Sequence, residues 1–131
     1  MNTAQRIRVL LVDDSAVFRR TVRGLLARYP DLEVVGEASA GNEAVEMVGK
    51  LHVEVVLMDI YLGRVMDGIA ATRLLLREWP GVAVLGLSVD SRAYVAAAMR
   101  EAGALDVLAK EQTADEVHQA ILRAAASMSD N

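Results

Sequence analysis

The stretch Ile7-Arg8-Val9-Leu10-Leu11-Val12-Asp13-Asp14-Ser15 decides the fold class of this chain. Its first six residues are almost all apolar and rich in β-branched side chains, which favours a β-strand. The apolar residues run on without alternation, and such a run is typical of a parallel strand that is covered on both faces. Two aspartates follow at once. We therefore expect Asp13 and Asp14 to lie at the carboxyl end of a buried strand.

A strand followed by a helix is expected five times along the chain. Strands are expected at 7–12, 32–38, 53–59, 82–88 and 105–109, and helices at 15–29, 42–51, 69–79, 91–102 and from 113 onward. A capping box at 113–116 opens the last helix, and Gly103 is expected to end the helix before it in a left-handed conformation. The third helix is expected to be buried through Ile69, Leu76 and Trp79. Five such units predict an α/β protein with a doubly wound, five-stranded parallel sheet.

Charged side chains at the ends of three strands indicate a shared site. Asp13 and Asp14 follow the first strand, Asp59 ends the third and Lys110 follows the fifth. The carboxyl ends of parallel strands line one crevice, where ligands bind. Three carboxylates there repel one another unless a cation lies among them, and oxygen ligands of this kind suit Mg²⁺. Because a lysine is a point charge suited to a phosphoryl group, the pattern predicts a Mg²⁺-assisted phosphoryl site.

The composition limits the classes of function. The 131 residues fit one domain, which we expect to span 1–131, with a flexible tail or the start of a linker at 127–131. Cysteine is absent, which rules out thiol chemistry, and the formal charge of −4 argues against nucleic-acid binding by this domain. No apolar run reaches the roughly 18 residues of a membrane span, and the first residues lack the apolar core of a signal peptide. A cytoplasmic protein is expected.

The residues at these strand ends resemble those of a known family, the receiver domains of bacterial two-component response regulators. The resemblance rests on Val12-Asp13-Asp14-Ser15, Leu57-Met58-Asp59, Leu87-Ser88 and Lys110, in this order and at these strand ends. It covers residues 7–126, and the segment 103–117 is most similar to the NarL/FixJ type. The resemblance implies the flavodoxin-like (βα)5 receiver fold and a role in two-component signal transduction.

The resemblance also implies a set of metal ligands. Asp14 and Asp59 would bind Mg²⁺ directly, together with the backbone carbonyl of Tyr61. Asp13 would hold a water molecule that is bound to the metal. Magnesium is therefore the one cofactor that we expect.

The resemblance further assigns the residues of phosphoryl transfer. Asp59 would be the phosphoacceptor and would take the group from a phosphohistidine. Lys110 would pair with Asp59 before transfer and with a phosphoryl oxygen afterwards. Ser88 would donate its hydroxyl to the phosphoryl group and move inward, which changes the conformation of the fourth and fifth strand–helix units. Such a domain catalyses only its own phosphorylation and dephosphorylation and is not otherwise an enzyme.

The partners follow from the same resemblance. A sensor histidine kinase or a phosphotransfer domain would donate the phosphoryl group. A homodimer through the fourth helix, fifth strand and fifth helix is expected, and the output that the domain controls is expected to be transcriptional. No nucleic acid and no membrane is expected to bind this domain directly.

Three positions depart from the pattern of the family. Gly63 stands where relatives carry proline, and one residue is inserted within 61–66, before Gly68. Val107 replaces the aromatic residue that commonly moves when the domain switches. Tyr61 and Asp90 occupy positions that tune the lifetime of the acyl phosphate. These departures leave open an alternative: a receiver-like module that binds partners without phosphorylation.

Overall fold

The computed structural model describes residues 5–63, 67–90 and 92–129, in which five strands alternate with five helices. The elements are β1 (Ile7–Val12), α1 (Ala16–Leu26), β2 (Leu32–Ala38), α2 (Gly41–Leu51), β3 (Val55–Asp59), α3 (Gly68–Glu78), β4 (Ala83–Ser88), α4 (Ala93–Glu101), β5 (Asp106–Ala109) and α5 (Ala114–Ser129). The expected elements are all present, with ends that differ by up to three residues. None of the helices in the described ranges is both long and apolar enough to span a membrane.

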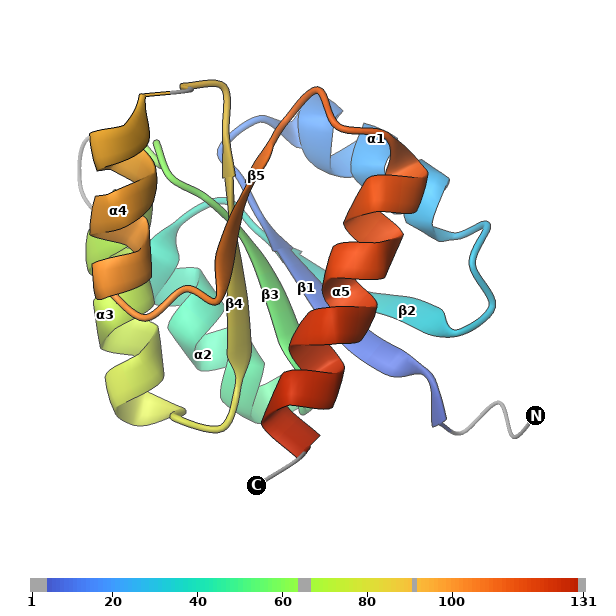
Figure 1. Cartoon of the computed structure of the whole chain (residues 1–131). Coiled ribbons are helices and arrows are strands. Elements are labelled where there is room, and N and C mark those ends of the chain that lie inside the picture. Colours follow the sequence, from blue (N-terminus) through green and yellow to red (C-terminus); the bar gives the residue numbers. More distant parts are fainter. Residues whose placement is uncertain (1–4, 64–66, 91, 130–131) are drawn as a thin grey trace.

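The strands form one parallel sheet in the order β2-β1-β3-β4-β5 (Figure 1). The chain moves from β1 outward to β2, then returns to the other side of β1 and continues through β3, β4 and β5. The direction of winding therefore changes between β1 and β3. In an open α/β sheet, this change of direction opens a crevice at the carboxyl ends of the two strands. The predicted doubly wound fold is confirmed, and the crevice lies where Asp13 and Asp59 end their strands.

Two apolar cores cover the two faces of the sheet. On one face, α2, α3 and α4 contribute small and aliphatic side chains, and on the other face α1 and α5 do so. In Figure 1, α5 lies in front of the sheet and α2 behind it. Buried helix residues of the two cores are Ala44, Val48, Ala71, Leu75, Val95 and Met99 on the first face, and Leu26, Ala120, Ile121 and Ala124 on the second. Burial on both faces explains why β3 and β4 carry no exposed residue.

The helix ends follow the local signals in the sequence. Ser15 caps α1, because its hydroxyl accepts a hydrogen bond from the backbone N–H of Phe18. Thr113 and Glu116 form the predicted capping box before α5, with each side chain accepting the other's backbone N–H at 3.2 and 3.0 Å. Gly103 follows α4 with a φ of +118°, a backbone conformation that residues other than glycine rarely adopt.

The expected tail is in part helical. Helix α5 continues through residues 127–129 to Ser129, whose hydroxyl donates to the carbonyl of Ala126. Three residues of the expected flexible tail or linker start, 127–129, are thus the last residues of α5, whose apolar face continues with the partly buried Met128. Residues 130–131 lie outside the described residues.

Trp79 is less buried than expected, with 40% of its surface exposed. Its indole N–H donates to the carbonyl of Val45 at 2.9 Å, and its ring covers Gly49 of α2. A β-carbon at position 49 would lie 2.4 Å from the ring. The indole therefore packs on the outer surface of α2, next to the end of α3, and does not fill the core.

Candidate functional site

Three carboxylates meet at the carboxyl ends of β1 and β3. Asp13, Asp14 and Asp59 each offer an oxygen, and these oxygens all lie within 4.8 Å of one another. Asp13 and Asp59 are buried, whereas Asp14 is exposed. A set of oxygen donors only, with one side open to solvent, suits Mg²⁺, which keeps part of its water when it binds to proteins. The three aspartates expected to hold the metal are thus brought together.

Asp13 is fixed from several directions. Its carboxylate accepts hydrogen bonds from the backbone N–H of Ser15 at 2.8 Å and from the Lys110 ammonium at 2.6 Å. The Arg19 guanidinium donates to its backbone carbonyl. The ammonium of Lys110 thus offsets the negative charge of the buried carboxylate, and the N–H of Ser15 satisfies its second oxygen. Asp13 is therefore a rigid part of the crevice wall.

The charge of Asp59 is less well compensated than that of Asp13. Its carboxylate accepts the backbone N–H of Tyr61 at 3.2 Å, and the Lys110 ammonium is 3.5 Å away. Burial and the nearby charge of Asp13 raise the pKa of Asp59 from 3.8 to about 6, against the opposing effect of Lys110. Lys110 was expected to pair with Asp59, but its shorter contact is with Asp13. Asp59 thus keeps a carboxylate that is only partly compensated.

Ser88, the last residue of β4, is buried and bonded to its own loop. Its hydroxyl accepts the backbone N–H of Asp90 at 2.9 Å and donates to the carbonyl of Asp90 at 3.2 Å. These bonds close a tight turn directly after the strand. The hydroxyl is therefore engaged away from Asp59 and must leave Asp90 if it is to reach a phosphoryl group.

A polar bridge joins the loops that follow β3 and β4. The Tyr61 hydroxyl donates to the Asp90 carboxylate at 2.8 Å, and the Arg92 guanidinium donates to the same carboxylate at 2.8 Å. Arg92 holds the pKa of Asp90 well below its usual range. Tyr61 and Asp90, singled out as separate positions in the sequence, are thus in direct contact. The contribution of Arg92 was missed, because its contact with Asp90 depends on side-chain conformations.

The loop after Asp59 is built on a glycine that proline could not replace. Gly63 has a φ of +86°, whereas the proline ring fixes φ near −65°. A β-carbon at this position would lie 3.9 Å from the Asp14 carboxylate, so the loop passes close to the exposed ligand. The inserted residue falls within 61–66, of which 64–66 lie outside the described residues.

Val107 leaves a hollow where an aromatic residue was expected from the family pattern. A cavity of about 160 Å³ lies beside the end of β4, and its walls include Ser88, Ala96 and Val107. A smaller side chain on β5 therefore leaves space on the side of Ser88 that faces α4.

Three features together define the receiver class of signalling domains. They are a parallel sheet wound in this order, an aspartate crevice at β1 and β3, and a lysine directly after β5. A family model of the response regulator receiver domain matches residues 9–122. The chain belongs to this family, which favours phosphorylation-dependent signalling over the module that acts without phosphorylation.

Relatives and solved structures that are similar to this chain support its membership of the family. The transcriptional regulatory protein DegU of Brevibacillus brevis is 39% identical over 88% of this chain and 49% of its own length. A protein-glutamate methylesterase/protein-glutamine glutaminase of Geobacter metallireducens is 44% identical over 81% of this chain and 31% of its own length. The solved receiver domain of NarL from Mycobacterium tuberculosis has a TM-score of 0.84 at 30% identity, and the match covers 92% of this chain and 97% of that domain. The chain thus spans half or less of these two curated relatives.

Proposed function

We propose that the chain accepts a phosphoryl group on Asp59 from a histidine kinase or phosphotransfer domain. The observation that carries this proposal is the crevice, where three carboxylates lie together and the Lys110 ammonium stands between Asp13 and Asp59. An Asp59 carboxylate oxygen forms a bond to the phosphorus of a phosphohistidine. The bond from phosphorus to the imidazole nitrogen breaks, and its electron pair stays on that nitrogen. The product is an acyl phosphate.

The three carboxylates are also the proposed metal site. Asp14 and Asp59 would bind Mg²⁺ directly, together with the backbone carbonyl of Tyr61, and Asp13 would hold it through a water molecule. When bound, the metal would offset the effects of burial and of the Asp13 charge, which together raise the pKa of Asp59, and would neutralise charge on the phosphoryl oxygens. The chemistry of the donor set supports this assignment, because all three side chains offer hard oxygen ligands.

Lys110 and Ser88 complete the proposed site. The Lys110 ammonium carries three N–H donors, so it can keep Asp13 and donate to a phosphoryl oxygen on Asp59. Ser88 exchanges its bonds with Asp90 for one to the phosphoryl group. Because Asp90 also holds Tyr61 and Arg92, this exchange displaces the β4–α4 loop. That loop is the proposed switch.

The proposal predicts one phosphoryl adduct on the intact protein after incubation with acetyl phosphate and Mg²⁺. We expect the adduct to be absent in Asp59→Asn and after addition of EDTA, since both remove a part of the crevice. Intact mass spectrometry measures it directly. Asp67→Asn is a matched control, because it changes an exposed aspartate outside the crevice. An adduct of equal yield in Asp59→Asn would contradict the assignment of the phosphoacceptor.

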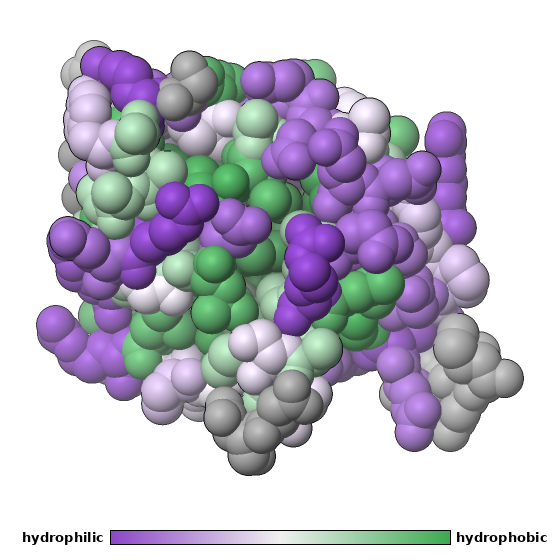
Figure 2. Space-filling model, in the orientation of Figure 1, coloured by the Kyte–Doolittle hydropathy of each residue, from purple (hydrophilic) through white to green (hydrophobic). Residues whose placement is uncertain are grey.

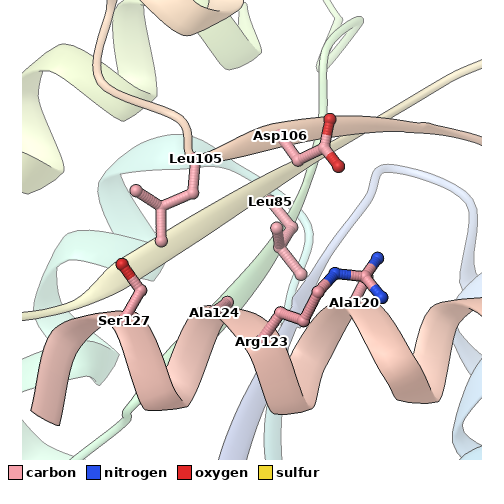
Figure 3. Close-up of a pocket in the computed structure, with 7 residues that line it drawn as sticks. All are labelled: Leu85, Leu105, Asp106, Ala120, Arg123, Ala124 and Ser127. Atoms are coloured by element: carbon pink, nitrogen blue, oxygen red, sulfur yellow. The ribbon is translucent and has the colours of Figure 1, made fainter. Parts of the chain in front are cut away.

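A second proposal concerns a homodimer through α4, β5 and α5. Figure 2 shows hydrophobic surface between α4 and α5, with hydrophilic side chains on either side. A pocket of about 230 Å³ lies there between β5 and α5 (Figure 3). Its walls include the exposed Leu105, the acidic Asp106 and the basic Arg123. Arg100 of α4 donates a hydrogen bond to Asp106 at 3.1 Å. A two-fold dimer needs a surface that complements itself, and these features provide one.

The dimer proposal predicts that phosphorylation doubles the molar mass in sedimentation equilibrium. Arg123→Glu is expected to weaken the dimer at least about tenfold, because it places like charges at the centre of the surface. Arg73→Glu, an exposed position on α3, is the charge-matched control and should leave the dimer intact. A phosphorylated protein that stays monomeric would contradict the proposal.

We further infer that this receiver works in the cytoplasm and controls an output of the longer protein or of a partner. DegU is named a transcriptional regulatory protein, and an output of this kind is proposed here. The chain itself carries a formal charge of −4, so contacts with nucleic acid are assigned to the output and not to the receiver.

A further inference from the structure

The Phe18 ring lies directly against the lysine of the site. The Lys110 ammonium is 4.3 Å from the centre of the ring, and the same ammonium is 2.6 Å from Asp13 and 3.5 Å from Asp59. The Lys110 side chain is only 17% exposed. Two carboxylates thus attract the cation on one side, while the face of an aromatic ring attracts it on the other.

The ring closes the side of the site that faces α1 and α5. A cavity of about 110 Å³ lies between these helices, and Phe18, Leu87, Lys110 and Val117 are among the residues that line it. Its walls are mainly apolar, so apart from the ring they provide no strong attraction for the ammonium. A smaller aliphatic side chain at position 18 would let the lysine turn toward this space, where water can reach it.

A ring face restrains the ammonium without competing for the phosphoryl group. The π-electrons attract the cation, but a benzene ring is a far weaker hydrogen-bond acceptor than a carboxylate. The lysine therefore stays in the crevice while its N–H groups remain available to a phosphoryl oxygen. A polar partner in the place of the ring would have to be given up during transfer.

We propose that Phe18 is a positioning residue that holds the Lys110 ammonium in place for phosphoryl transfer to Asp59. The proposal rests on the proposed function, because it assigns Phe18 an effect on that reaction. It extends the site to the first turn of α1. Phe18 touches neither the phosphoryl group nor the metal and acts only through the lysine.

Four proteins test this role: wild type, Phe18→Leu, Phe18→Tyr, and a protein with trifluorophenylalanine at position 18. Acetyl phosphate is the donor, at saturating Mg²⁺, and the rate constant of adduct formation is measured by intact mass. We expect a roughly three- to tenfold lower rate for Phe18→Leu and a smaller decrease for the fluorinated ring, because fluorine withdraws π-electron density at nearly constant shape. Phe18→Tyr keeps the ring and should retain the wild-type rate. Because Mg²⁺ is saturating, a change in Mg²⁺ affinity that follows from a displaced ammonium does not enter this rate constant.

A second readout does not depend on transfer. Ring current should shift the Lys110 ε-methylene protons upfield in the NMR spectra of wild type and Phe18→Tyr, and this shift should disappear in Phe18→Leu. Equal rates in all four proteins would overturn the proposal, as would a loss in Phe18→Tyr as large as in Phe18→Leu, which indicates packing alone. If wild type forms no adduct, the proposed function fails, and the presence or absence of the upfield shift still decides whether Phe18 holds Lys110.

Discussion

Replacing Asp59 with asparagine is expected to stabilise the metal-free protein by about 2 to 3 kcal/mol at pH 7. The cause is the position of the carboxylate, which is 4% exposed and close to the charge of Asp13. Folding raises the pKa of Asp59 from 3.8 to about 6, so ionisation costs more in the folded than in the unfolded chain. Asparagine removes that cost, and its carbonyl can still accept the N–H of Tyr61.

The sign of this effect fixes its dependence on pH. Below pH 3.8 Asp59 is protonated in both states and costs nothing, whereas above about pH 6 it is ionised in both states and the full cost applies. The stability of wild type relative to Asp59→Asn should therefore fall as pH rises from about 4 to about 6 and stay constant above. Urea unfolding of both proteins between pH 4 and pH 8, in EDTA, measures the difference.

Two controls separate this cause from others. Asp67→Asn changes an exposed aspartate that caps α3, where asparagine caps equally well, and should show no comparable pH dependence. Added Mg²⁺ should stabilise wild type more than Asp59→Asn, because ligand binding to the folded state adds to its stability. A variant that is no more stable than wild type at pH 7 would show that Lys110 already compensates the charge of Asp59.

The sheet and its crevice could be predicted because their signals are local and repeated. Each buried strand is a continuous apolar run. A carboxylate directly after such a run is costly to bury unless it is paired, so it indicates a site. Parallel topology then places Asp13 and Asp59 at the same edge of the sheet, and the pairing of β1 with β3 makes them neighbours. Capping at Thr113 and the left-handed Gly103 were equally readable, since each depends on a few neighbouring residues.

The contacts inside the site could not be predicted in the same way. Whether Lys110 lies nearer Asp13 or Asp59 depends on differences of about an ångström that the sequence does not carry. The bonds of Ser88 to Asp90 and the ring of Phe18 against Lys110 depend on side-chain conformations. Trp79 shows a related limit: its size suggested burial, but a glycine on α2 gave its ring a place at the surface.

Replacing Gly68 with alanine is expected to destabilise the protein by about 3 kcal/mol, the upper end for an overpacked core. Gly68 begins α3, and its N–H donates to the carbonyl of Ile60 at 2.7 Å. A β-carbon there would lie 2.1 Å from the carbonyl oxygen of Asp59 and 2.7 Å from the α-carbon of Ile60. Both obstacles are backbone atoms, so no side chain can turn away. The segment that carries Asp59 must move, and Mg²⁺ affinity should fall with stability.

The matched control is Gly24→Ala, the same substitution at an exposed position inside α1. Apart from its chain neighbours and the backbone of α1, no atom of the described residues lies within 4 Å of a β-carbon at position 24, so alanine should stabilise the protein by about 0.5 to 1 kcal/mol through helix propensity. Urea unfolding gives both free energies, and isothermal titration gives the Mg²⁺ affinity of each folded variant. If Gly68→Ala unfolded at the same urea concentration as wild type, the close approach of α3 to the end of β3 would be contradicted. If it lost stability but kept full Mg²⁺ affinity, the clash would be relieved by a movement of α3, and the carboxylate of Asp59 would be held by β3 and β4 alone.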